Sequence, residues 1–138
     1  MKSDRGSITI WMLGLSVLLL LFGGLSIDFW RALALQRELA AVADSAAIAA
    51  ASGIDEELYR STGQVVLDQA RAEALGAASM AAQELDPVSF VVATDDDGLS
   101  VNVVVVDVVE LGLLGVFVDQ TEPLTVRAEA TASPRLLP

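Results

Sequence analysis

The hydrophobic pattern opens with a stretch of twenty residues that carry no charge, Ile8 to Ile27. At about 1.5 Å per residue, a helix of this length is roughly 30 Å long, which matches the hydrocarbon core of a bilayer. Lipid offers no hydrogen-bond partners to backbone N–H and C=O groups, so a single span has to be helical. The pattern therefore predicts a tail over residues 1–7, a transmembrane helix over residues 8–27 and a tethered domain over residues 28–138.

The helical pattern continues beyond the span, since no proline precedes Pro87 and the first natural helix stop is Gly53. We expect an extension of the same helix over residues 28–52. Two apolar stripes follow it at helical spacing. Such stripes either seat the helix on its own domain or let a second helix approach closely. One stripe comprises Leu35, Leu39, Val42, Ala46 and Ala49, and the other comprises Ala43, Ala47 and Ala51.

The next segments are more polar. Residues 54–62 read as a linker or short turn. Residues 64–85 are rich in alanine and charged residues, with apolar positions on one face, and this periodicity predicts a second helix. Asp86-Pro87 should end it, because the residue before a proline disfavours the α region.

The period then changes to that of strands. The β-branched runs Val88–Thr94 and Leu99–Val106 flank an Asp-Gly turn, which predicts a hairpin. Leu124–Thr131 alternates apolar and polar residues, as a half-buried strand does. Between them, Leu111–Phe117 is predicted to form an apolar helical turn or a surface loop. If it is exposed, an apolar patch of this kind indicates contact with a partner or lipid. We predict an α+β, pilin-like fold with a three-stranded antiparallel sheet over residues 88–131 and helices on one sheet face.

Charge is distributed unevenly around the span. The tail contains Lys2, Asp4 and Arg5, whereas the residues after Ile27 include six basic and eighteen acidic side chains, a net charge of −12. The positive-inside rule therefore predicts a cytoplasmic N-terminus and an extracytoplasmic C-terminal domain. A domain this acidic would repel nucleic-acid phosphates, so nucleic acid is not an expected partner.

Candidate chemistry is sparse. The chain contains no Cys and no His, which excludes disulfides and removes the commonest general base and metal ligand. The run Asp95-Asp96-Asp97-Gly98 lacks the alternating ligands of a calcium loop and suits a tight turn, with weak cation binding as the alternative. We expect no enzyme activity, no cofactor and no metal site.

A cleaved signal peptide is the competing interpretation of the span, because Ala32-Leu33-Ala34 fits a small-x-small cleavage site. A signal peptide's apolar region usually has about 7–15 residues, so the length of this one favours a retained membrane helix.

Polar residues on the long helix are the candidates for partner contacts. Asp28 and Arg31 lie three residues apart at the membrane exit, where they can pair with each other or meet a neighbouring subunit. Asp44 lies among alanines, and desolvating a carboxylate is costly, so it should face water or a partner's arginine. The candidate interface residues are Asp28, Arg31, Leu35, Leu39, Ala43, Asp44, Ala47 and Ala51.

The N-terminal third of the chain resembles the signature of TadE/TadG-like proteins of Tad (Flp-type) pilus assembly. In that family an Arg-Gly-Ser start leads through a hydrophobic helix to an Asp, an Arg, a Gln-Leu-rich turn and an alanine run with one Asp. The closing strand, Leu124–Ala132, is also similar to that of the family. The matching residues of the signature are Arg5-Gly6-Ser7, Asp28, Arg31, Gln36, Leu39, Ala43-Asp44, Ala46-Ala47 and Ala49-Ala50-Ala51.

The resemblance implies a membrane component of a Tad-like pilus or secretion apparatus that packs against other subunits, as a homo- or hetero-oligomer, and contacts lipid. Processed prepilins of this system carry a Glu five residues after the cleavage-site Gly, whereas here that residue is Trp11. This departure favours an unprocessed TadG-like protein. The alternatives are a minor pseudopilin in the filament and an acidic surface-binding module released by signal peptidase.

Overall fold

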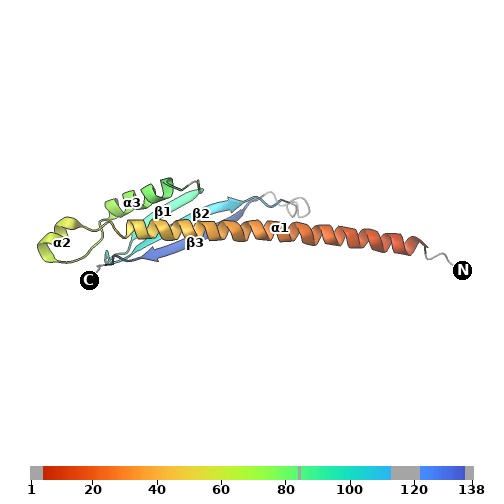
Figure 1. Ribbon diagram of the computed structural model, residues 1–138, viewed down its shortest axis with the longest axis horizontal. Coiled ribbons are helices and arrows are strands. Elements are labelled where there is room, and N and C mark those ends of the chain that lie inside the picture. The colour runs from red at the N-terminus through yellow and green to blue at the C-terminus, as the bar shows by residue number, and fades with distance from the viewer. Residues whose placement is uncertain (1–4, 84, 113–121, 136–138) are drawn as a thin grey trace. The chain divides into compact units, whose positions relative to one another are not determined.

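The computed structural model describes residues 5–83, 85–112 and 122–135. Within these ranges the chain has the predicted α+β fold, with a long N-terminal helix, two further helices and a three-stranded antiparallel sheet. The elements in chain order are α1 (Arg5–Ala50), α2 (Glu56–Thr62), α3 (Gln69–Ala81), β1 (Ser89–Thr94), β2 (Val101–Val109) and β3 (Leu124–Ala132) (Figure 1).

The chain divides into two compact units. The first, the apolar unit, consists of Met1–Ala34 and Val109–Leu124. The second, the sheet unit, consists of Leu35–Val108 and Thr125–Pro138. Helix α1 contributes residues to both units.

Helix α1 is one continuous helix over Arg5–Ala50, close to the predicted range. Its sequence contains no proline and many alanines, the strongest helix formers. The helix ends at Ala50, slightly before the predicted end at residue 52. A Cβ atom on Gly53 would lie only 2.8 Å from the backbone nitrogen of Ala72, so the absence of a side chain lets the two segments meet.

The prediction of a linker or short turn over residues 54–62 is wrong in part, because Glu56–Thr62 forms helix α2. The Asp55 carboxylate accepts hydrogen bonds from the backbone N–H groups of Glu57 (3.0 Å) and Leu58 (2.9 Å), which caps the helix N-terminus. Gly63 ends the helix in the left-handed conformation, with φ of 73°. These two caps stabilise a helix that carries no apolar stripe.

The second predicted helix, residues 64–85, is shorter than expected: α3 covers Gln69–Ala81. The segment before it is extended, since the Leu67 N–H donates to the Gly98 carbonyl at 2.8 Å and Leu67 forms a β-bridge with Ile54. The Asp68 carboxylate then caps α3 by accepting from the Arg71 N–H at 3.0 Å. Leu67 has the spacing of the apolar helix face, so periodicity alone did not show this boundary.

The predicted hairpin is confirmed. Strands β1 and β2 pair antiparallel from Ser89↔Val106 to Thr94↔Val101. Gly98 has φ of 67°, a conformation that glycine adopts without steric cost. Strand β2 starts at Val101 rather than at the predicted Leu99, because the Leu99 N–H is used within the turn, where it donates to the Asp97 carboxylate at 3.0 Å. The order of strands in the sheet is β1-β2-β3.

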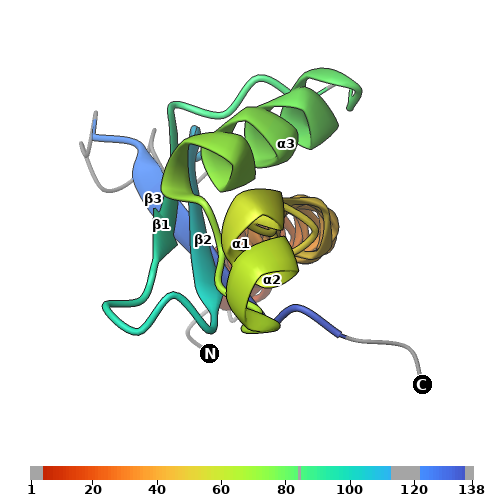
Figure 2. The ribbon, with the colours of Figure 1, turned by 90° about the vertical axis from the view of Figure 1, so that its left-hand side faces the viewer.

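The core of the sheet unit lies between one sheet face and the helices. Figure 2 shows α3 and the C-terminal part of α1 on the same side of the sheet. Strand β2 supplies three fully buried valines, and β3 alternates buried and exposed residues as predicted. The buried side chains on the strands are Val92, Val101, Val103, Val105, Val126, Ala128 and Ala130, and those on α1 are Leu39, Val42, Ala43, Ala46, Ala47 and Ala50.

Helix α3 approaches both of its neighbours at Gly76. A Cβ atom there would lie 2.9 Å from Val92 Cγ2 on β1 and 3.6 Å from Ala50 Cβ on α1. Close packing at this junction depends on small residues on both helices.

Candidate functional site

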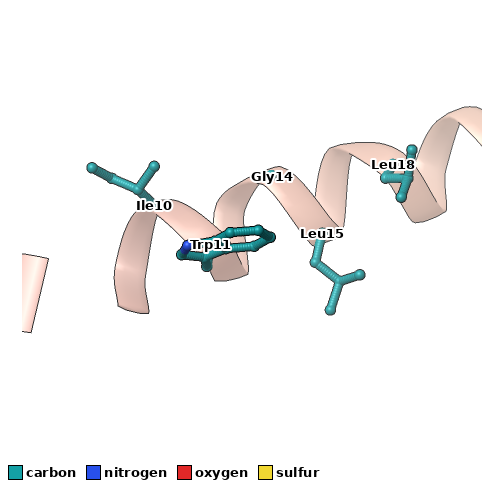
Figure 3. Close-up of a pocket in the computed structure, with 5 residues that line it drawn as sticks. All are labelled: Ile10, Trp11, Gly14, Leu15 and Leu18. Carbon is teal, nitrogen blue, oxygen red and sulfur yellow. The ribbon is translucent and has the colours of Figure 1, made fainter. Parts of the chain in front are cut away.

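The N-terminal half of α1 exposes its large apolar side chains within the described part of the apolar unit. The exposed residues include leucines, isoleucines, Phe22 and Trp11. Figure 3 shows a depression on this segment that is lined by Ile10, Trp11, Gly14, Leu15 and Leu18, all from α1 itself. A single helix cannot enclose a ligand, and this depression forms because Gly14 has no side chain. This open depression is therefore no enclosed small-molecule site.

Helix α1 has the length and composition of a membrane span, and it is the one helix with both properties among the residues that the structure describes. The apolar part lies near the N-terminus, as the sequence predicts. These observations fit a membrane protein.

Asp28 is the one buried charged residue of the described ranges, with only 2% of its surface exposed. Its Oδ1 atom accepts a hydrogen bond from the backbone N–H of Gly112 at 3.1 Å. Both residues belong to the apolar unit. The carboxylate predicted to lie at the exit of the span therefore binds the chain that follows β2, 84 residues further along.

Arg31, the other residue predicted at this level, is exposed on the same helix. Its Nη1 atom would lie 3.3 Å from a Cβ atom on Gly112, and Asp28 Oδ1 would lie 3.0 Å from it. Gly112 thus sits directly beside both polar groups. Gly112 was not among the predicted interface residues; the signal for it in the sequence is a glycine within an apolar run.

Four of the predicted interface residues are buried in the described structure: Leu39, Ala43, Ala47 and Ala51. All four belong to the sheet unit. Their burial supports the interpretation that the stripes seat the helix on its own domain. These four side chains are covered by the protein's own chain, and their contact with a partner stays a prediction.

The remaining two candidates differ from these four. Asp44 is exposed, as expected for a carboxylate among alanines, and Leu35 is half-buried. Next to Asp44 on the outer face of α1, one helical turn further along, Ile48 is 70% exposed. The outer face of the helix therefore combines an acidic and an apolar side chain.

The acidic hairpin turn is held by its own hydrogen bonds. The Gly98 N–H donates to the Asp95 carbonyl at 2.8 Å, and the Ser100 hydroxyl donates to the Asp95 carboxylate. Thr94 and Asp95–Asp97 line an open depression there. Within the described residues, no group of three or more His, Cys, Asp or Glu side chains is arranged to hold a metal ion. The geometry is that of a turn, the interpretation favoured by the sequence.

One charge cluster links α2 to α3. Glu56 forms ion pairs with Arg71 (2.7 Å) and Arg60 (2.9 Å). The hydrogen bond and positive charge of Arg71, and then the charge of Arg60, lower the pKa of Glu56 below its ordinary value of 4.5. The Glu56 carboxylate is exposed to solvent, so its ion pairs contribute a small stabilisation of the contact between α2 and α3.

Of the predicted apolar segment Leu111–Phe117, only Leu111 and Gly112 lie within the described residues. The rest of that prediction falls outside them.

Comparison with known proteins identifies a family likeness over the N-terminal segment. No curated protein and no solved structure matches the chain. A family model does match, over the part that contains the apolar helix, Asp28, Arg31 and the alanine stripes, about a third of the chain. Residues 6–53 of this protein match the Tad family of TadE/G-like Flp pilus-assembly proteins, which confirms the resemblance drawn from the sequence.

Proposed function

We propose that this protein is a single-pass membrane component of a Tad/Flp-type pilus assembly or secretion apparatus. Its role is structural: it packs against partner subunits through its helix and sheet unit and carries out no catalysis. The match of residues 6–53 to the pilus-assembly family is the observation that carries this proposal. The exposed apolar half of α1 supports the membrane location.

The proposed orientation places the N-terminus in the cytoplasm and residues 28–138 outside it. Lys2 and Arg5 precede the span, whereas the residues after it carry a net charge of −12. Basic residues are retained on the cytoplasmic side of membrane helices, which supports this topology.

The proposed partner surface is the outer face of α1. Asp44 is exposed there, and it neighbours the exposed Ile48. A carboxylate beside an apolar side chain suits a partner helix that presents an arginine and a small apolar patch.

Charge reversal of Asp44 tests this surface. Cells that produce the full-length protein are treated with a mild crosslinker, the membranes are solubilised, and partners are identified by co-purification. We expect Asp44→Lys to reduce recovery of a partner that the native protein captures. Glu38→Lys is the matched control, since Glu38 is also exposed on α1 but on another face. Equal recovery with both variants would remove Asp44 from the interface.

Fractionation tests the membrane assignment itself. The full-length chain should remain in the membrane pellet after alkaline extraction and dissolve only with detergent. Recovery as a freely soluble species would contradict the proposal. The mature mass tests the two alternatives: loss of the first six residues would indicate a processed pseudopilin, and a new N-terminus near Leu35 in the medium would indicate a released binding module.

A further inference from the structure

The hydrogen bond between Gly112 and Asp28 locates the start of the β2–β3 connection. Asp28 immediately follows the last residue of the uncharged segment Ile8–Ile27. The Gly112 N–H lies 3.1 Å from the Asp28 carboxylate, within the apolar unit. Gly112 therefore lies at the level where the apolar segment of α1 ends.

The side chains around this level suit a lipid headgroup layer. Phe29 and Trp30 follow Asp28 and are exposed, and aromatic side chains of this kind gather at membrane interfaces. The Arg31 guanidinium lies beside Gly112. A cation at headgroup depth can pair with a lipid phosphate.

The chain at Gly112 is apolar as well. Leu111 is half-buried and Gly112 is exposed. In the sequence, no charged residue occurs between Glu110 and Asp119. Leu111 and Gly112, the uncharged residues of this segment that the structure describes, suit lipid contact at the end of a proposed membrane span.

We propose that Leu111–Gly112 is a second lipid-contacting segment, held in the headgroup layer by the Asp28 carboxylate. This inference rests on the proposed membrane span of α1. The occupant of the surface is lipid, because the site lies where the apolar segment of α1 ends, at the level of the exposed Phe29 and Trp30. Asp28 acts as a positioning residue, binding the backbone of the segment rather than the lipid.

Site-specific fluorescence quenching tests the proposal in the full-length protein. The chain has no native cysteine, so Leu111→Cys provides a unique site for an environment-sensitive label. The labelled protein is reconstituted in phosphatidylcholine vesicles whose lipids are brominated close to the headgroup. Leu18→Cys on the apolar helix and Leu99→Cys, exposed on the hairpin of the sheet unit, are labelled in parallel.

We expect quenching at position 111 and not at position 99. Asp28→Ala should abolish the signal at position 111, whereas Asp28→Asn should preserve it, since the amide oxygen still accepts the Gly112 N–H. Gly112→Val should also abolish it, because its Cβ atom would crowd Asp28 and Arg31.

Lipids brominated deep in the acyl chains separate the two proposals. If they fail to quench position 18, the membrane span is wrong. If they quench position 18 but headgroup-brominated lipids quench position 111 no more than position 99, the span stands and the second lipid-contacting segment is overturned. Equal quenching at position 111 in Asp28→Ala and the native protein overturns the positioning role of Asp28.

Discussion

The side chain of Gln69 joins the first turn of α3 to the end of β1 through Thr94. Gln69 Oε1 accepts a hydrogen bond from the Thr94 backbone N–H at 2.8 Å and another from the Thr94 hydroxyl. Its Nε2 atom donates to the Val92 carbonyl at 3.3 Å. One side chain thus satisfies backbone groups at the edge of the sheet and fixes where α3 begins to cover it.

Gln69→Ala should destabilise the sheet unit by about 1–2 kcal/mol, because a backbone N–H loses its partner and the helix loses a tie to the strand. Denaturant unfolding of the detergent-solubilised protein, followed by circular dichroism, measures the change. Gln64→Ala, at an exposed position outside the helices, is the control and should have little effect. Equal midpoints for the two variants would show that the Gln69 bonds contribute nothing.

At Gly76, α3 packs closely against β1. Gly76→Leu should cost about 1–3 kcal/mol of stability, because the new side chain would overlap Val92. Ala77→Leu, at an exposed position of the same helix, should be neutral. Denaturant unfolding of both variants measures the effect. Equal midpoints for Gly76→Leu and Ala77→Leu would contradict the close packing at this junction.

Ala47 is only 1% exposed, so a large side chain there should act on the fold. From the sequence alone, Ala47→Trp would be expected to impair assembly while leaving membrane insertion intact. With Ala47 in the core, we expect faster proteolysis of the sheet unit and a lower unfolding midpoint, while membrane insertion persists. Ile48→Trp, on the exposed face, should preserve the fold. If Ala47→Trp lost partners at unchanged stability, Ala47 would be an interface residue after all.

The ion pairs of Glu56 predict a pH dependence. Its pKa is lowered in the folded protein by Arg71 and Arg60, so its contribution is present above the ordinary value of 4.5 and is lost as the pH falls through the lowered value. Glu56→Gln should therefore reduce stability at neutral pH and have no effect in strong acid. The exposure of the group makes the effect small and sensitive to salt.

Unfolding midpoints of the native protein and Glu56→Gln at the two pH values measure this difference. Glu57→Gln is the control, because Glu57 forms no ion pair within the described residues. A pH-independent difference between Glu56→Gln and the native protein would contradict the ion-pair explanation.

Local patterns in the sequence were sufficient for several features of the fold. A long helix without proline, the hairpin at Asp95–Gly98 and the alternation along β3 all depend on steric and hydrophobic preferences that act over a few residues. The likeness of residues 6–53 to the pilus-assembly family could also be identified from the sequence. The short helix α2 was missed because its evidence lay in the caps at Asp55 and Gly63 rather than in an apolar stripe.

Other features depend on residues that are distant in the sequence. Leu67 fits the apolar face predicted for the second helix, yet its N–H donates to the Gly98 carbonyl in the hairpin turn, and α3 starts later. Periodicity shows that Ala43 and Ala47 share a face, but it does not show whether that face meets the protein's own strands or a partner. From the sequence, Asp28 is likewise only a residue at the boundary of the span. The tertiary structure shows that its carboxylate accepts the Gly112 N–H. Short-range propensity determines the elements, whereas burial and backbone hydrogen bonding between distant segments determine which faces remain free to bind.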